Sequence, residues 1–279
     1  MVRVTGRRWL ITGTSSGLGA ALAKAALAIG DQVAGTTRSP DAARAFSAIA
    51  PGRSFGIHAA CQDVGQAAAI VAEGIAAMGG LDRLVNNAGY ALSCAVEVAS
   101  ESETRAQFDA NLFGPLALAR AALPHLLETG GRILNISSLA ALESYPGLGL
   151  YCASKAALSA ASEALDREVA PLGVRVIAIE PGGMRTAFAG GSLRTGEGQL
   201  DRYVSFDADR RAAFARSDGN QTGDPARISQ FVIALADHAC PPARVLVGDD
   251  VLTRAEDAFA ARLEGYRRMI ALSSDIAFP

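Results

Sequence analysis

The sequence is poor in the residues that build metal sites and disulfide frameworks. It has only four cysteines and three histidines among 279 residues. The cysteines show no C-x-x-C spacing, and the histidines have no acidic or cysteine neighbours at the spacing of metal ligands. We therefore expect reduced thiols, which favour an intracellular protein, and no metal site.

Basic clusters and long apolar runs are also missing. The net charge is −2 without a basic block, so the chain has no electrostatic footprint for nucleic acid. The arginines near Arg267 and Arg268 are interpreted as a solvated helix face. No apolar run reaches the ~18 residues that cross a bilayer, and no signal-peptide pattern precedes the first apolar run. We expect a cytoplasmic protein that does not insert into membranes.

Short apolar runs alternate with alanine-rich helical patterns along the whole chain. Seven runs have the length and composition of buried strands: 8–12, 32–36, 53–58, 83–86, 132–137, 174–180 and 244–247. Strands that alternate with helices in this way form a parallel sheet with helices on both faces. The sequence thus predicts an α/β fold of the doubly wound type, with a seven-stranded parallel sheet and one domain over residues 1–279.

A glycine-rich turn follows the first predicted strand. It reads Thr12-Gly13-Thr14-Ser15-Ser16-Gly17-Leu18-Gly19, and apolar residues then recur at helical spacing from Leu18 to Ile29. Glycines let a phosphate approach the backbone, and the free N–H groups of a helix N-terminus attract its charge. The turn therefore indicates a binding site for a dinucleotide pyrophosphate. A plain structural loop is the alternative.

Tyr151 and Lys155 lie four residues apart on one predicted helix, and Ser138 lies thirteen residues upstream. Residues i and i+4 share a helix face, so the lysine ammonium can lie close to the phenol. A charge about 4 Å away at an effective dielectric of ~20 is worth ~4 kcal/mol, or roughly three pK units. We therefore expect Lys155 to lower the pKa of Tyr151, which would then act as an acid and base.

These motifs together resemble the short-chain dehydrogenase/reductase superfamily in its common single-domain form. The family's glycine turn is matched at 12–19, its N-N-A-G motif at 86–89 and its Y-x-x-x-K motif at 151–155. Asn111, Ser138 and the motif Pro181-Gly182-Gly183-Met184-Arg185-Thr186 follow the family's order as well. The resemblance implies a Rossmann-type fold and hydride transfer with a nicotinamide cofactor.

The resemblance also assigns roles to individual residues. Tyr151 would be the acid/base, Lys155 would lower its pKa and bond the nicotinamide ribose, and Ser138 would bond the reacting oxygen. The neighbouring Ser137 is the alternative to Ser138, but only Ser138 has the family's spacing. Asn111 would hold a water of a proton relay, or be a plain polar helix residue. The cofactor would contact Gly13, Ser15, Ser16, Gly17, Leu18, Gly19, Thr37, Arg38, Asp63, Val64, Asn87, Ala88, Gly89, Tyr151, Lys155, Pro181, Gly182 and Thr186.

Two of these assignments have specific alternatives. Asp63 would bond the adenine, or else act as a helix N-cap. An NAD enzyme is expected to carry an acid about 20 residues beyond the glycine turn, where this chain has Thr37 followed by Arg38. A guanidinium there can pair with a 2′-phosphate, so we expect NADP rather than NAD. Arg38 as an exposed loop cation is the alternative.

Residues 187–223 interrupt the regular alternation with clustered glycines. We interpret the segment as a substrate lid whose inner surface comprises Phe188, Leu193, Leu200, Tyr203 and Phe206; an ordered surface insertion is the alternative. If it is not a lid, the fixed wall of the substrate site would consist of Tyr90, Leu92, Leu139 and Tyr145.

The expected activity is interconversion of a small-molecule ketone and a secondary alcohol. The stretches 181–188 and 223–225 resemble hydroxysteroid- and retinol-dehydrogenase-like members, which implies an apolar, mid-sized substrate. A regulator that binds NADP without turnover is the competing hypothesis, although the four residues with assigned catalytic roles, Asn111, Ser138, Tyr151 and Lys155, are all present. Such relatives usually associate through the helices that carry Asn111 and Tyr151, so we expect a homodimer or homotetramer. Leu112, Leu116, Leu158 and Leu165 are the candidate interface residues.

Overall fold

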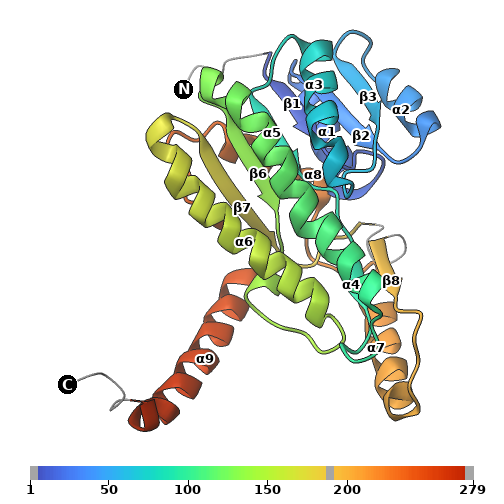
Figure 1. Ribbon diagram of the computed structural model, residues 1–279, viewed down its shortest axis with the longest axis vertical. Coiled ribbons are helices and arrows are strands. Elements are labelled where there is room, and N and C mark those ends of the chain that lie inside the picture. Colours follow the sequence, from blue (N-terminus) through green and yellow to red (C-terminus); the bar gives the residue numbers. More distant parts are fainter. Residues whose placement is uncertain (1–5, 187–191, 274–279) are drawn as a thin grey trace.

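A seven-stranded parallel sheet forms the centre of the computed structural model, which describes residues 6–186 and 192–273 (Figure 1). The strand order is β3-β2-β1-β4-β6-β7-β9, so the order reverses between β1 and β4. The bounds are β1 Arg8–Ile11, β2 Gln32–Thr37, β3 Ser54–His58, β4 Arg83–Asn86, β6 Arg132–Ile136, β7 Arg175–Pro181 and β9 Arg244–Val247. The sequence prediction of these strands is confirmed to within about one residue at each end.

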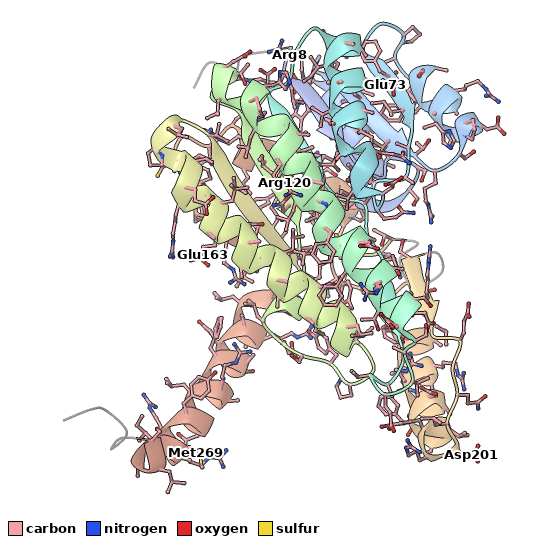
Figure 2. The ribbon with its side chains drawn as sticks, viewed as in Figure 1. Arg8, Glu73, Arg120, Glu163, Asp201 and Met269 are labelled. Carbon is pink, nitrogen blue, oxygen red and sulfur yellow. The ribbon has the colours of Figure 1, made fainter. Side chains whose placement is uncertain are left out.

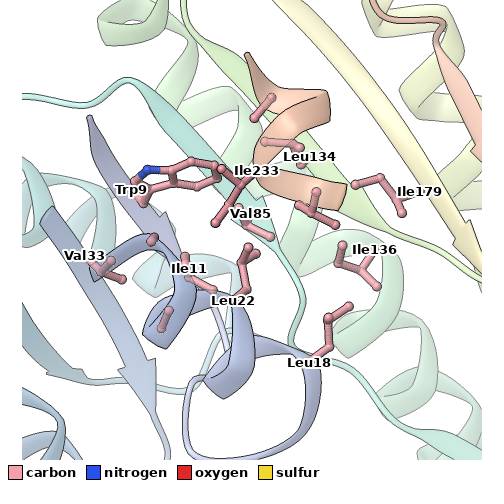
Figure 3. Close-up of a cluster of buried hydrophobic side chains, with 14 of the residues drawn as sticks. Trp9, Ile11, Leu18, Leu22, Val33, Val85, Leu134, Ile136, Ile179 and Ile233 are labelled. Atoms are coloured by element: carbon pink, nitrogen blue, oxygen red, sulfur yellow. The ribbon is translucent and has the colours of Figure 1, made fainter. Parts of the chain in front are cut away.

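Strand residues alternate between two hydrophobic cores because successive side chains point to opposite faces of a sheet. Trp9 and Ile11 pack into one core with the helices α1 and α8, and Figure 3 shows this cluster around Leu22 and Ile233. Leu10, between them, packs into the other core with α3 and α5. Both faces are therefore buried, which explains the continuous apolar runs.

Helices cover both faces of the sheet. Their bounds are α1 Gly17–Ala28, α2 Pro40–Ser47, α3 Ala67–Met78, α4 Glu101–Phe108, α5 Gly114–Thr129, α6 Gly149–Val169, α7 Val204–Ser217, α8 Pro225–Ala236 and α9 Val251–Ser273. Several begin with a clear local signal. Ser100 and Glu103 form a reciprocal capping box at α4, and Asp224 followed by Pro225 starts α8.

Arginine begins five of the seven strands, at the edge of the sheet opposite the glycine-rich turn. Arg8 forms two hydrogen bonds with the Asp82 carboxylate, at 2.9 and 2.8 Å, and Arg175 binds Asp166 in the same way at 2.8 and 2.9 Å. Arg8 also donates to the Gly79 carbonyl just beyond the end of α3, at 2.8 Å. These side chains therefore tie strand starts to neighbouring elements and to the carbonyls at helix ends.

The chain after β7 contains regular elements that the sequence pattern did not predict. β8, Leu193–Thr195, pairs in parallel with β5, Ala91–Ser93, and α7 follows. The glycine-rich sequence around β8 and the scarcity of apolar residues in α7 removed the periodic signal there. The first part of the expected lid, residues 187–191 with Phe188, lies outside the described residues. Among the helices of the described residues, none is long and apolar enough to cross a membrane.

Candidate active site

A cleft opens at the carboxyl ends of the strands, where the strand order reverses, as expected for a ligand site in a doubly wound sheet. It encloses about 1180 Å³, including its open mouth. The sequence-predicted residues that line it are Gly13, Ser15, Ser16, Gly17, Leu18, Thr37, Arg38, Asn87, Ala88, Gly89, Tyr151, Lys155 and Thr186. Segments far apart in the sequence therefore form one site.

The glycine turn is held tightly against the end of β4. Gly13 and Gly17 adopt left-handed backbone conformations, with φ of 73° and 59°. A Cβ on Gly19 would lie 2.3 Å from the Gly13 carbonyl oxygen, so only glycine allows α1 to start this close to the turn. Within the described structure the Ser16 side chain makes no capping hydrogen bond. The first N–H groups of α1 thus face the cleft, which fits a pyrophosphate.

Asn87 locks the turn from the neighbouring strand end. Its side-chain amide donates to the carbonyl oxygens of Thr12 and Gly13 at 2.8 and 3.2 Å, and the Thr12 hydroxyl accepts from the Asn87 backbone N–H at 2.9 Å. A Cβ on Gly17 would lie 3.7 Å from Cβ of Thr186, which is ordinary van der Waals contact. The glycine turn and the motif that ends at Thr186 are therefore neighbours in the lining of the cleft.

Tyr151 and Lys155 line the cleft, and Ser138 lies beside Tyr151 just outside the lining. The Tyr151 phenol is hydrogen-bonded with the Ser138 side chain. The Lys155 ammonium lies 5.9 Å from the centroid of the Tyr151 ring and donates to the Ile136 carbonyl at 2.7 Å. The Ser137 hydroxyl instead points to the backbone, donating to the Lys155 carbonyl at 3.1 Å. This geometry supports Ser138 rather than Ser137 as the partner of Tyr151.

Burial reverses the pKa shift that the sequence predicted for Tyr151. Loss of hydration raises the pKa of the phenol to about 12, and the hydrogen bond from Ser138 offsets this only in part. Burial also lowers the pKa of Lys155 to about 8. The prediction of a lowered tyrosine pKa is wrong for this structure because desolvation outweighs the hydrogen bond from Ser138. At neutral pH Tyr151 holds its proton and is able to donate it.

Three fully buried serines of α6 hold the helix that carries Tyr151 and Lys155 in place. Ser154 accepts from the Asn111 amide at 3.0 Å, and Ser162 accepts from Asn135 at 2.8 Å. Ser159 donates to the buried Glu180 at 2.7 Å and lies 2.7 Å from the Ser137 hydroxyl. Because these bonds are buried, they fix the rotation of α6 and with it Tyr151 and Lys155.

Asn111 lies in a π-helical stretch, Asp109–Phe113, between α4 and α5. Its side chain is completely buried and both donates to and accepts from the Tyr90 backbone, at 3.0 and 3.1 Å. A Cβ on Gly89 would lie 2.8 Å from Asn111 Oδ1 and 3.6 Å from Lys155 Nζ. Asn111 is therefore close to Lys155 without lining the cleft itself.

The end of β2 presents Arg38 to the cleft. Arg38 is exposed, whereas Thr37 is buried and donates to the Ser39 carbonyl at 2.9 Å. Thr36, which the sequence analysis missed, accepts from the Gly13 N–H at 3.1 Å and also lines the cleft. The only charged side chain that these three positions offer to a ligand is thus the Arg38 guanidinium.

Other predicted site residues lie away from the cleft wall. Asp63 caps the short helix after β3, accepting from the Gly65 N–H at 3.0 Å and from the Gln66 amide at 2.8 Å. Both Asp63 and Val64 are exposed. The predicted residues outside the lining are Gly19, Asp63, Val64, Asn111, Ser138, Pro181 and Gly182. The capping bonds correspond to the alternative interpretation of Asp63.

Residues outside the predicted cofactor contacts complete the cleft, and Tyr90 among them is a predicted residue of the fixed substrate wall. They are Thr36, Ala59, Cys61, Tyr90, Ile136, Ser137, Met184, Ser192 and Arg194. Arg194 on β8 lies 4.3 Å from the centroid of the Tyr90 ring, a cation–π distance. Met184 and Ser137 could have been found from the sequence, because both adjoin predicted residues. The position of Arg194 depends on the pairing of β8 with β5, which the sequence does not show.

Comparison with known proteins agrees with this site. Residues 7–196 match the family model described as short chain dehydrogenase. The chain belongs to the short-chain dehydrogenase/reductase superfamily. As a member of this superfamily, it is a pyridine-nucleotide-dependent oxidoreductase, and the cleft residues fit such a cofactor.

Individual members of the superfamily resemble the chain over most of its length. It is 33% identical over 271 residues to the oxidoreductase BOA17 of Botryotinia fuckeliana, covering 95% of this chain and 98% of that protein. It is 30% identical over 249 residues to a 3-ketodihydrosphingosine reductase of Bacteroides thetaiotaomicron, covering 86% and 87%. A crystal structure of a short-chain dehydrogenase from Streptomyces avermitilis superposes with a TM-score of 0.88 at 34% identity, covering 98% of this chain and 100% of that one.

Proposed function

We propose that this short-chain dehydrogenase is an NADP-preferring ketone reductase that also runs in reverse as a secondary-alcohol dehydrogenase. The observation that carries the proposal is the group formed by the buried Tyr151 and Lys155 in the cleft and by Ser138, which is hydrogen-bonded with Tyr151. The exposed Arg38 at the end of β2 supports NADP, because a guanidinium pairs with a 2′-phosphate.

The bound cofactor supplies the hydride, and the protein supplies position, polarity and a proton. Tyr151, protonated at neutral pH, donates to the carbonyl oxygen during reduction and takes the proton back during oxidation. Ser138 hydrogen-bonds the same oxygen and stabilises the charge that develops on it. Lys155 holds the cofactor ribose and compensates the negative charge of the ionised phenol. Thr186 orients the carboxamide, and Asn111 supports the proton path behind Lys155.

An apolar surface next to Tyr151 supports a mid-sized apolar substrate. Tyr151 belongs to a cluster with Ala91, Tyr145, Leu148 and Leu193, which come from β5, from the loop before α6 and from β8. Leu193 belongs to the described part of the expected lid, so the lid contributes to the wall beside the reacting group. The name of the Bacteroides relative supports a ketone as the reacting group. The resemblance to hydroxysteroid and retinol dehydrogenases points to substrates of similar polarity.

The test is a panel of cyclic, aromatic and long-chain ketones assayed with NADPH and NADH. We expect turnover with NADPH, and Tyr151→Phe should lose most of kcat while retaining cofactor affinity. The ring remains in that variant but the transferable proton is gone. Tyr266→Phe is the matched control, since Tyr266 is 66% exposed on α9. Near wild-type kcat in Tyr151→Phe, with chemistry shown to limit the rate, would contradict the proposal.

The competing hypothesis is a regulator that binds NADP without turnover. It would show tight NADPH binding by fluorescence and no reduction of any ketone in the panel. The complete group of Ser138, Tyr151 and Lys155 favours the enzyme, since binding alone does not require a proton donor.

A further inference from the structure

Helix α9 carries a series of large apolar side chains that the described residues leave exposed. The helix extends away from the sheet and its flanking helices (Figure 1). Only Val251 and Ala255, in its first turns, are buried. The apolar residues along the rest of the helix are 47% to 78% exposed: Leu252, Phe259, Leu263, Tyr266, Met269, Ile270 and Leu272. Figure 2 shows Met269 near the outer end, away from the body.

The base of α9 is firmly attached to the body. Arg254 donates to Glu143 Oε2 and to the Tyr145 hydroxyl, at 2.9 and 2.7 Å, and Arg262 donates to the Leu142 carbonyl at 3.0 Å. The helix therefore keeps a fixed direction over its first three turns. Its outer half has no such contacts among the described residues, although a helix gains most of its stability from packing of an apolar face. A partner for that face is expected.

The exposed apolar residues form one stripe. Leu252, Phe259, Leu263, Tyr266 and Ile270 recur at intervals of seven, four, three and four residues, so they share one side of the helix. With 23 residues at ~1.5 Å each, the helix is about 35 Å long. The stripe runs along nearly all of it and has the spacing of a helix–helix seam.

Four of the five stripe residues are placed symmetrically along the helix, whereas Tyr266 has Glu256 at its mirror position. Leu252 and Ile270 are equally far from Ala261, and so are Phe259 and Leu263. The charges beside the stripe follow the same symmetry. Glu256 and Arg267 are eleven residues apart, which is about three turns, so they lie on the same flank with their midpoint beside Ala261. Both side chains are exposed.

This symmetry specifies the partner. We propose that α9 packs antiparallel against α9 of a second copy of the chain, around a two-fold axis near Ala261. Such an axis brings each flank of the helix against the same flank of the other copy. Leu252 then meets Ile270, Phe259 meets Leu263, and Glu256 meets Arg267, each twice.

A membrane surface fits the stripe less well. Helices that lie on membranes carry mostly Lys and Arg on their polar side. Here Glu256, Asp257 and Glu264 are interspersed with the arginines. In a pair of copies the acidic side chains of one helix can pair with the arginines of the other, whereas an anionic lipid surface would repel the acidic side chains.

The test uses two charge-reversed variants of the full chain, Glu256→Arg and Arg267→Glu. Each places like charges against each other in its own homodimer, so the mass measured by light scattering at micromolar concentration should fall to half of the wild-type value. An equimolar mixture should regain the wild-type mass, because each variant then meets the opposite charge. Asp257→Arg and Arg268→Glu are matched controls; they are also eleven residues apart but lie away from the stripe, and should leave the mass unchanged.

Circular dichroism and NADPH binding check that each variant folds. Two results would overturn the proposal. One is a wild type that is monomeric, whether or not it co-sediments with vesicles of mixed neutral and anionic phospholipids. The other is a pair of folded variants, Glu256→Arg and Arg267→Glu, that both keep the wild-type mass. These readouts do not depend on catalysis, so they are separate from the test of the proposed reductase activity.

Discussion

Lys155 carries an ammonium group into a place that water hardly reaches. It is 6% exposed, and its pKa is lowered from 10.5 to about 8 by burial alone. Its hydrogen bond to the Ile136 carbonyl does not restore the lost hydration. A group of this kind costs stability for the sake of function, as expected for catalytic residues with shifted pKa values.

This cost is measurable as a dependence of stability on pH. Between pH 8 and 10.5 the unfolded chain holds a proton at Lys155 that the folded chain has released. The free energy of unfolding therefore rises with pH through this window, and below pH 8 the full penalty of the buried ammonium applies. Lys155→Met should therefore gain on the order of 3 kcal/mol over wild type at pH 7 relative to pH 10.5. Urea unfolding at both pH values measures it. Lys24→Met, at an exposed position of α1, should show no such difference. If the free energies of unfolding of Lys155→Met and wild type differ by the same amount at both pH values, the pKa shift is disproved.

Arg38 is the residue that should set cofactor preference. Replacing Thr37 by Asp and Arg38 by Ala supplies an acid for the ribose and removes the cation for a 2′-phosphate. The ratio of kcat/KM with NADPH to that with NADH should fall at least about tenfold, since one charged hydrogen bond is worth about 1.5–3 kcal/mol. Lys24→Ala serves as a control for charge. An unchanged ratio would transfer the role to another cation of the cleft, for which Arg194 is the candidate.

Among the secondary-structure elements, the buried ones were the easiest to predict. Strands such as β4 and β6 are covered on both faces, so their sequences are continuous apolar runs with little ambiguity. α7 was missed because Arg210 is its only buried residue. A helix that buries so little needs no apolar residues at helical spacing, so the sequence carries no periodic signal there. The pairing of β5 with β8 joins segments about a hundred residues apart, and local sequence carries no record of it.

The same distinction holds within the site. Glycine turns and the Tyr151–Lys155 spacing are local, so sequence alone located the residues that the structure brings together. The raised pKa of Tyr151 depends on how completely the fold removes water from it, which is a property of the assembled structure. The buried hydrogen bonds between α6 and the sheet, such as that from Ser159 to Glu180, could be found only in the structure, because each serine alone resembles an ordinary helix residue.

The described part of the expected lid is fastened at identifiable points. Tyr203 donates to Glu97 at 2.8 Å, Arg202 pairs with the same carboxylate, and Arg210 contacts Ser93 on β5. The lid hypothesis predicts that amides of residues 192–217 gain protection from hydrogen exchange when NADPH and a substrate analogue bind together. Glu97→Ala should speed exchange there in the absence of ligand and raise KM more than it changes kcat. Glu101→Ala, which removes another exposed ion pair, is the control. Unchanged protection would identify residues 192–217 as an ordered surface insertion.

On the scale of the whole molecule, the structure narrows the expected association surface. Leu158 is 1% exposed and is used by the core, whereas Leu112, Leu116 and Leu165 are half-buried and Phe113 is 47% exposed. The junction of α4 and α5 thus remains available for the association that the family resemblance implies. It is separate from the stripe on α9.

With two separate association surfaces, the α4–α5 junction and the α9 stripe, we expect a tetramer in which each surface can be disrupted independently. Phe113→Glu alone and Arg267→Glu alone should each give dimers, and the double variant should give monomers. Light scattering across a concentration series measures this, with circular dichroism as the control for folding. If Phe113→Glu keeps the wild-type mass, the α4–α5 junction is not an interface, and the assembly ends at the α9 dimer.

The arginines at the starts of the strands affect which substitutions this protein can tolerate as it evolves. The Arg8–Asp82 and Arg175–Asp166 pairs lock the sheet at the edge farthest from the cleft, so the framework does not draw its stability from the residues that bind ligands. Substitutions at the opposite edge can accumulate without loosening these locks. Laboratory evolution toward a new ketone should accordingly tolerate broad libraries in the loops after the strands, while the same diversity at the strand starts would yield mostly unfolded protein.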